Sequence, residues 1–372
     1  MKTPTLLLSV LFTACALRAE SPRLAEVFRP YFPIGMGVDR QDLDAPDVWE
    51  LVKRHASSVT VENAMKPGPT QPRPGEFTFE RADRVVAAAR DAGLEIHGHT
   101  LVWHRSTPDW MFEDQNGDPV SKDLLRERLR AHIQGVAGHY RGKVVSWDVV
   151  NEALADGGGE SDFRNSPWYQ ILGFEYLLEA FLAAEAADPE ALLFYNDYGL
   201  EKDPKRTRAL RLIQRLRDAG AKVDGIGIQA HLQVDSPSIS EIEQSILAFR
   251  EAGLKIHISE LDVSMYPWRR PGSELIEADR IHEDGLTEEG EAALTQRYAE
   301  LFALFRKHHQ SIYKVTFWNT HDGRSWLNNH PVRGRVDHPL LFDRDLNPKP
   351  AFHRVVEEAK EDLARPLEPD VE

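Results

Sequence analysis

Cysteine is almost absent from this sequence of 372 residues, which contains only Cys15. A chain with one cysteine forms no internal disulfide bond, so its hydrophobic core alone must stabilise the fold. Glycine-rich loops that cradle phosphates between a strand and a helix are also lacking, which argues against a nucleotide-binding protein.

Positive charge is scarce as well. The chain has 45 Lys and Arg against 60 Asp and Glu, which gives a formal charge of −15. Binding to nucleic acid through its phosphates needs a basic face, so the acidic excess argues against nucleic acid as a partner. It weakly favours a neutral or cationic ligand over a polyanion.

An apolar run long enough to span a bilayer is lacking too. Lys2 precedes an apolar stretch from Leu6 to Leu17, which is too short for a transmembrane helix but typical of an export signal. We expect residues 1–19 to be a signal peptide and the protein to be secreted or periplasmic. The letters LFTAC, ending at Cys15, also resemble a lipoprotein box, so a lipid anchor in the outer membrane is the alternative.

What the chain does contain is a series of eight short apolar runs separated by helical patterns. The runs cover residues 32–38, 57–63, 94–104, 143–152, 191–198, 223–232, 254–263 and 312–322. Eight βα units without a linker predict one closed (β/α)8 barrel of the α/β class, a TIM barrel. We assign 20–365 to this single domain and 366–372 to a tail. An open doubly wound sheet is the alternative, and the regular repeats disfavour it.

Glycines mark the ends of three helical patterns, at Gly93, Gly220 and Gly253. We expect the helix before Gly253 to be capped by Ser240. The charged segment 264–290 is expected to be an enlarged loop after the seventh strand.

Polar side chains end seven of the eight runs. They are Glu62 with Asn63, His99 with His104, Asn151 with Glu152, Asn196 with Asp197, Gln229 with His231, Glu260 with Asp262, and Trp318. In a barrel the carboxyl ends of the strands converge on one mouth, where the active site of this fold lies. We therefore expect these groups to form one site.

Two glutamates at these ends have the chemistry of a glycosidase. A protonated carboxyl donates to the leaving oxygen, while an ionised carboxylate attacks the anomeric carbon. Gln229 and His231 precede Glu260 by one strand and are expected to donate to it, which keeps it charged. We therefore predict Glu260 as the nucleophile and Glu152 as the acid/base. Either glutamate alone is more often a solvated strand-end charge.

The remaining groups suit a sugar. Glu62, Asn63 and Lys66 offer donors and acceptors for hydroxyl pairs. Trp103, Trp318 and Trp326 offer flat faces for pyranose rings, whereas Trp147 is expected to pack in the core.

Together these segments resemble glycoside hydrolase family ten, the retaining endo-β-1,4-xylanases on a (β/α)8 barrel. The resemblance runs from about residue 32 to 355. Its motifs, in order, are VTVENAMK, GHTLVWH, WDVVNEAL, NDYGLE, DGIGIQAHL, ISELDV, TFWNTHDGRSWL and PLLFDRDLNPKPAF. It implies an enzyme that hydrolyses internal bonds of xylan or xylo-oligosaccharides, without metal or cofactor and as a monomer.

The resemblance also assigns roles. It implies Glu152 as acid/base, Glu260 as nucleophile and Asp262 as support for Glu260 through His231. It implies substrate contacts from Glu62, Asn63, Lys66, His99, Trp103, Asn151, Tyr198, Gln229, His231, Trp318 and Trp326. The sequence departs from the family pattern at Pro67, His97, Gly199 and Asn319, where the family usually has an aromatic residue, Arg, a polar residue and Gly.

Two other classes of function remain as alternatives. His97 and His99 have the spacing of a two-histidine metal site, which His231 and Asp262 could complete in a metal-dependent hydrolase. A carbohydrate-binding barrel without activity is the other, although it would tolerate loss of one carboxylate and both are present. Within the xylanase interpretation, preference between xylan and cellulose depends on bulk near Lys66 and Trp318.

Overall fold

The computed structural model describes residues 22–157, 159 and 161–364. The expected signal peptide, Cys15 and the expected tail at 366–372 lie outside these residues. Within the part described, no helix is both long and apolar enough to cross a membrane.

The strands form a closed parallel barrel. They are β1 Ile34–Val38, β2 Ser58–Val61, β3 Glu95–Trp103, β4 Ser146–Asn151, β5 Leu192–Asp197, β6 Gly225–Ile228, β7 His231–Gln233, β8 Lys255–Ser264 and β9 Ile312–Phe317. Strand β1 pairs with β2 and β9, and β6 pairs with β5 and β8, so the sheet has no open edge. The predicted barrel is confirmed, and the doubly wound alternative is wrong.

One predicted run is split in two. The run 223–232 forms β6 and then β7, because the chain turns at Ala230, which has a φ of 56°. Strand β7 pairs only with the outer half of β8, His231 opposite Asp262. The break therefore places His231 beside the strand that bears Glu260.

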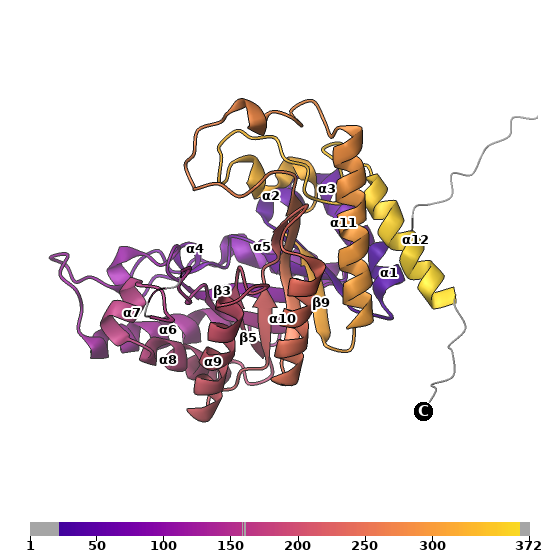
Figure 1. The fold of residues 1–372 in the computed structure, drawn as a ribbon. Coiled ribbons are helices and arrows are strands. Elements are labelled where there is room, and N and C mark those ends of the chain that lie inside the picture. The colour runs from indigo at the N-terminus through magenta and orange to yellow at the C-terminus, as the bar shows by residue number, and fades with distance from the viewer. Residues whose placement is uncertain (1–21, 158, 160, 365–372) are drawn as a thin grey trace, which may run out of the picture.

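Helices surround the strands, as Figure 1 shows. The α-helices are α1 Leu24–Phe28, α2 Arg40–Leu43, α3 Pro46–His55, α4 Pro67–Thr70, α5 Glu80–Asp91, α6 Lys122–His139, α7 Pro167–Leu172, α8 Glu175–Ala187, α9 Lys205–Asp218, α10 Ile239–Glu251, α11 Glu288–Lys307 and α12 Pro350–Ala364. Short 3-10 helices are η1 Asp109–Met111, η2 Glu277–Asp279, η3 Asp322–Arg324 and η4 Trp326–Asn328.

The predicted helix ends are confirmed at the three glycines, and one predicted start is wrong. Gly93, Gly220 and Gly253 have φ values of 72°, 88° and 68°, the left-handed conformation of a helix C-terminus. Helix α10 is capped by Ser238 rather than Ser240. The Ser238 hydroxyl accepts from the Glu241 amide at 3.3 Å, and the Glu241 carboxylate accepts from the Ser238 amide at 2.8 Å. This reciprocal pair starts the helix two residues early.

The barrel interior is filled by side chains from the strands. Inside the barrel, the fully buried His97 and His257 have ring centres 4.7 Å apart. Trp147 is also fully buried, as expected, but it lies on the outer face of its strand, where it packs on Gly98 and near Tyr140 at the end of α6. A Cβ atom at Gly98 would lie 2.2 Å from the Trp147 ring, so only glycine leaves room for it. The barrel is therefore a packed core rather than a pore, as is usual for this fold.

The loop between β8 and α11 is anchored rather than free. Asp337 is fully buried and accepts from the Ser264 hydroxyl at 2.5 Å and from the Met265 amide at 3.1 Å. In Figure 1 this loop is orange and arches beside the yellow segment that follows β9. The anchor brings Trp268 within 6.4 Å of Trp326, between ring centres.

Candidate active site

The two glutamates lie in one hydrogen-bond network at the barrel mouth. Glu152 follows β4, Glu260 lies on β8, and both are buried, with 7% and 5% of their surface exposed. The Asn196 amide donates to Glu260 Oε1 at 2.7 Å and to Asn151 Oδ1 at 2.9 Å. The Gln229 amide donates to the same Asn151 oxygen and to Glu152 Oε1, both at 3.2 Å. The prediction that Gln229 donates to Glu260 is therefore wrong, because its side chain lies on the Glu152 side of the network. Strands β4, β5 and β6 thus join the two carboxylates through their ends.

Glu260 faces a positive charge. His231 Nε2 lies 3.2 Å from Glu260 Oε2, and His231 Nδ1 lies 3.0 Å from Asp262 Oδ2. Burial lowers the pKa of His231, but the charge and hydrogen bonds of Asp262 and Glu260 outweigh it and raise the pKa to about 10. Burial likewise raises the pKa of Glu260, while the hydrogen bond from His231 and the charges of His99 and His231 lower it to below its ordinary value. Glu260 is therefore ionised at neutral pH.

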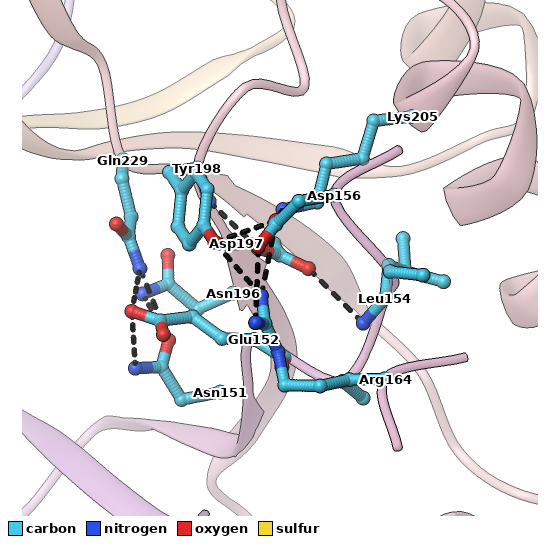
Figure 2. Close-up of polar contacts among 12 residues, drawn as sticks. Asn151, Glu152, Leu154, Asp156, Arg164, Asn196, Asp197, Tyr198, Lys205 and Gln229 are labelled. Atoms are coloured by element: carbon cyan, nitrogen blue, oxygen red, sulfur yellow. Dashed lines mark hydrogen bonds and ion pairs between the residues drawn. The ribbon is translucent and has the colours of Figure 1, made fainter. Parts of the chain in front are cut away.

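Glu152 is surrounded by uncharged donors. The Trp103 indole donates to Glu152 Oε2 at 3.0 Å, and Gln229 and Asn151 donate to Oε1 at 3.2 and 3.4 Å. Figure 2 shows the Asn151 and Gln229 amides converging on this carboxyl. Neutral donors orient the group without the ion pair that Glu260 has.

A third carboxylate, that of Asp148, lies deeper in the barrel and orients His99. Asp148 Oδ2 lies 2.8 Å from His99 Nδ1 and 3.1 Å from His97 Nε2. Burial raises the pKa of Asp148, but the charges and hydrogen bonds of His97 and His99 hold it well below its usual range. Asp148 lies inside an apolar run, so the sequence pattern does not mark it as a site residue.

The histidine pair at the end of β3 is thus already engaged. His97 Nδ1 also lies 2.7 Å from the Ser146 hydroxyl, and the residue is fully buried. Within the ranges that the structure describes, no three His, Cys, Asp or Glu side chains are grouped as a metal site requires. The two histidines therefore orient the mouth through Asp148.

Polar groups from β2 lie on another side of the mouth. Lys66 Nζ donates to Asn63 Oδ1 at 2.8 Å and lies 5.0 Å from the Trp103 ring centre. Burial raises the pKa of Glu62, although Lys66 opposes it, and burial lowers the pKa of Lys66, although Glu62 opposes it. These residues present both donors and acceptors in a half-buried position.

Asn319 explains one departure from the family pattern. It has a φ of 88°, which favours glycine but which asparagine also tolerates. Its side-chain amide donates to Glu62 Oε2 at 2.8 Å, and its oxygen accepts from the Trp326 amide at 3.2 Å. Asn319 therefore connects the groups from β2 to an aromatic wall.

Three aromatic residues form that wall. Trp326 donates to Asp262 Oδ2 at 2.7 Å, and its ring centre lies 4.7 Å from that of His231. The Trp318 ring is edge-on to His99 at 5.3 Å. Trp268, half exposed, continues the wall outward from Trp326.

Tyr198 lies beside Glu152, but its hydroxyl is occupied. It donates to Asp156 Oδ1 at 2.5 Å and accepts from Arg164 at 2.8 Å. The Lys205 ammonium lies 3.5 Å from the ring centre. The contacts described above therefore connect the residues that were predicted to bind sugar or to act in catalysis, with Tyr198 at the edge of the group.

Comparison with known proteins identifies this arrangement. Residues 23–358 match the family model described as glycosyl hydrolase family 10. The chain belongs to this family. The resemblance drawn from its motifs is confirmed, and the chain is a glycoside hydrolase.

Relatives cover nearly the whole chain. An endo-1,4-β-xylanase of Geobacillus stearothermophilus is 43% identical over 90% of this chain and 98% of its own length. Endo-1,4-β-xylanase B of Paenibacillus barcinonensis is 40% identical over 91% and 99%. The crystal structure of xylanase XynB from Paenibacillus barcinonensis, complexed with a conduramine derivative, matches at a TM-score of 0.84, 40% identity, and 91% and 99% coverage. A family 10 endoxylanase from a sugarcane soil metagenome matches at 0.87, with 36% identity and the same coverage.

Proposed function

We propose that this family 10 member is an endo-1,4-β-xylanase that hydrolyses internal bonds of xylan with retention of configuration, with Glu260 as nucleophile and Glu152 as acid/base. The observation that supports these roles most is the asymmetry of the two carboxylates. Glu260 contacts the cationic His231, whereas Glu152 contacts three uncharged donors.

In the first step, ionised Glu260 attacks the anomeric carbon of the xylose at the cut. Protonated Glu152 donates its proton to the oxygen that leaves, and a glycosyl-enzyme forms. The His231–Asp262 pair stabilises Glu260 as a carboxylate before attack, and Asn196 directs Oε1 by its hydrogen bond. Glu260 is thus hydrogen-bonded on both carboxylate oxygens, Oε1 by Asn196 and Oε2 by His231.

In the second step, Glu152 acts as the base. It removes a proton from water, which attacks the same carbon and releases the sugar with its original configuration. Glu260 leaves as a carboxylate, and His231 again stabilises the charge that returns to it. Glu152 ends the cycle protonated, and no cofactor enters the balance.

The other side chains of the mouth are proposed to bind the sugar chain. Asn151 lies between the two carboxylates, where its amide suits the 2-hydroxyl of the reacting sugar, a contact that strengthens in the transition state. The remaining proposed contacts are Glu62, Asn63, Lys66, His99, Trp103, Tyr198, Gln229, His231, Trp318 and Trp326. Polar groups on one side and indole faces on the other fit the edges and faces of pyranose rings.

Product analysis tests this function. The wild-type enzyme incubated with xylan, arabinoxylan and cellulose should release xylo-oligosaccharides of several lengths from the first two substrates, in chelator as well as without it. Proton NMR of the first product formed should show the β-anomer. An initial α-anomer would mean inversion, and release of single xylose units alone would mean an exo-acting enzyme.

We also propose that the enzyme is exported. This proposal rests on residues 1–19, which have the pattern of a signal peptide, and on the size of the polymeric substrate. We further propose that the enzyme acts as a monomer. Mass spectrometry of the mature N-terminus after expression in a bacterial host distinguishes cleavage after Ala16 or Ala19 from lipid attachment at Cys15. Sedimentation analysis determines the oligomeric state.

A further inference from the structure

The backbone of Glu152 has an unusual conformation. Its φ is 58°, in the left-handed region, where a residue with a side chain is disfavoured. The residue is also buried at the barrel mouth. Surrounding contacts must therefore hold Glu152 in place, and they determine the direction of its carboxyl.

Arg164 provides the main contact. Its Nε donates to the Glu152 carbonyl at 3.0 Å, and its two terminal nitrogens each donate to one oxygen of Asp156 at 3.0 Å. One of these nitrogens also donates to the Tyr198 hydroxyl at 2.8 Å. The rigid guanidinium fork therefore joins the backbone of Glu152 to the loop that follows it, as Figure 2 shows.

A second set of contacts fixes Arg164 in turn. Asp156 accepts from Tyr198 at 2.5 Å and from Lys205 at 3.1 Å. Lys205 also lies 2.8 Å from Asp197, a fully buried residue at the end of β5. Burial raises the pKa of Asp156, but Tyr198, Lys205 and Arg164 lower it to about 2, so the cluster stays charged. We call Arg164, Asp156, Tyr198 and Lys205 the Arg164 clamp.

The peptide groups on either side of Glu152 are held as well. The Glu152 amide donates to the Asn196 carbonyl at 2.9 Å. The Tyr195 hydroxyl accepts from the amides of Ala153 and Leu154 at 3.0 and 3.1 Å. The Glu152 carbonyl and the Ala153 amide belong to one peptide plane, so Arg164 holds this plane at its oxygen and Tyr195 holds it at its nitrogen.

We propose that Arg164 is a positioning residue for the acid/base, which aims the Glu152 carboxyl at the leaving oxygen by holding its backbone in the left-handed conformation. The inference rests on the proposed role of Glu152. Arg164 contacts Glu152 only through the carbonyl, so its removal should disturb the geometry of proton transfer more than the attack by Glu260. A misplacement of about 1 Å can reduce a rate by about 100-fold.

The leaving group separates positioning from general stability. A dinitrophenyl group leaves without help from an acid, whereas a methylumbelliferyl group or a sugar leaves faster when protonated. The Arg164→Gln variant should therefore lose about 10- to 100-fold in kcat/KM on xylan and methylumbelliferyl xylobioside, and less than about threefold on dinitrophenyl xylobioside. Release of the glycosyl-enzyme still needs Glu152 as a base, so kcat for the dinitrophenyl substrate should fall even though kcat/KM does not; azide, which attacks the glycosyl-enzyme without a base, should restore that kcat.

Arg211→Ala is the matched control. Arg211 forms a two-pronged ion pair with Asp162 at 3.0 and 2.6 Å and so anchors the same loop, but it does not contact Glu152. This variant should keep wild-type values with every substrate. Equal losses for both leaving groups in Arg164→Gln, no loss in Arg164→Gln, or the same pattern in Arg211→Ala would each overturn the proposal.

Two further variants protect the test. Asp156→Asn weakens the two bonds that hold the guanidinium of Arg164 and should give the same pattern at smaller size if Arg164→Gln does not fold; a uniform loss would overturn the proposal. Glu152→Ala tests the underlying role. If it lacks the leaving-group dependence, the proposed function fails; if it has the dependence and Arg164→Gln does not, only the positioning role fails.

Discussion

Glu152 and Glu260 occupy the same barrel mouth in opposite surroundings. The carboxylate of Glu260 shares a cation, His231, with Asp262, and that cation has a pKa of about 10. The carboxyl of Glu152 accepts from an indole and two amides, and its nearest guanidinium, Arg164, contacts its carbonyl instead. The fold thus places positive charge on the side chain of one glutamate and on the backbone of the other.

The difference shows how one barrel can prepare two like groups for opposite tasks. A nucleophile must remain ionised, and in a buried site, where desolvation opposes charge, a hydrogen-bonded cation offsets that penalty. An acid/base must gain and lose a proton in each cycle, and an ion pair on its carboxyl would oppose protonation. Uncharged donors and a held backbone give direction without that penalty.

Removing Glu260 should have the largest effect on activity. In Glu260→Ala no covalent intermediate forms, so the enzyme should not turn over xylan or dinitrophenyl xylobioside. Steady-state rates with both substrates measure this. Normal turnover of the dinitrophenyl substrate would show that another group attacks the sugar.

Removing Glu152 should have the next largest effect. Loss of general acid catalysis should reduce kcat/KM on xylan by about 10²- to 10⁴-fold in Glu152→Ala, with little change for a dinitrophenyl leaving group. When azide is added, proton NMR should show a glycosyl azide of β-configuration. An α-azide would contradict the double displacement.

Asp262→Asn tests whether the His231–Asp262 pair stabilises the charge on Glu260. Hydrogen bonds to charged groups contribute about 1.5–3 kcal/mol, so kcat should fall by about 10- to 100-fold. Since Asp262 raises the pKa of His231, the variant should also lose the basic limb of kcat/KM near pH 10 and show one at lower pH. Dinitrophenyl xylobioside is the substrate to use, because it needs no proton from Glu152. An unshifted limb would contradict the role of the pair.

Protonation of His231 also makes the free energy of unfolding depend on pH. The pKa of His231 rises from 6.5 to about 10 on folding, so its contribution to the free energy of unfolding is full below pH 6.5 and is lost as pH rises through 10. Denaturant titrations of wild type and Asp262→Asn should therefore differ most at and below pH 6.5 and converge toward pH 10. A difference that grows with pH would show that His231 is neutral in the folded protein.

Asn319→Gly should have the smallest effect. It removes one hydrogen bond to Glu62 from a position whose backbone glycine adopts easily, which corresponds to about two- to tenfold in KM for xylan. Because Asn319 contacts neither catalytic carboxylate among the hydrogen bonds of the described residues, the pH profile should stay unchanged. A shifted profile would place Asn319 in the network of Glu152 and Glu260.

The sequence predicted most of the fold because the signals were local and repeated. Apolar runs marked every strand, and Gly93, Gly220 and Gly253 marked helix ends. The break at Ala230 escaped prediction, since alanine is an ordinary strand residue and only the pairing with β8 requires its positive φ. Ser238 and Ser240 both precede a glutamate by three residues, so this spacing does not tell which of them caps α10.

The site was less predictable in its supporting groups. Asn196 was expected at the mouth, but its bonds to Glu260 and Asn151 come from neighbouring strands whose register the sequence does not state. Asp148 was hidden by its apolar neighbours, and Arg164 lies in a loop without a periodic pattern. Asn319 appeared only as a departure from the family, and its contact with Glu62 gives it a function.

The order of residues by itself determined the number of βα units, the strand ends that bear polar groups and the two glutamates, since these follow from periodicity and residue type. Tertiary structure alone decided the contacts that hold each glutamate. His231 reaches Glu260 because β7 pairs with β8, and Arg164 reaches the Glu152 carbonyl because the loop after β4 folds back over it. Electrostatic influence falls with distance and grows with burial, and both are properties of the folded chain.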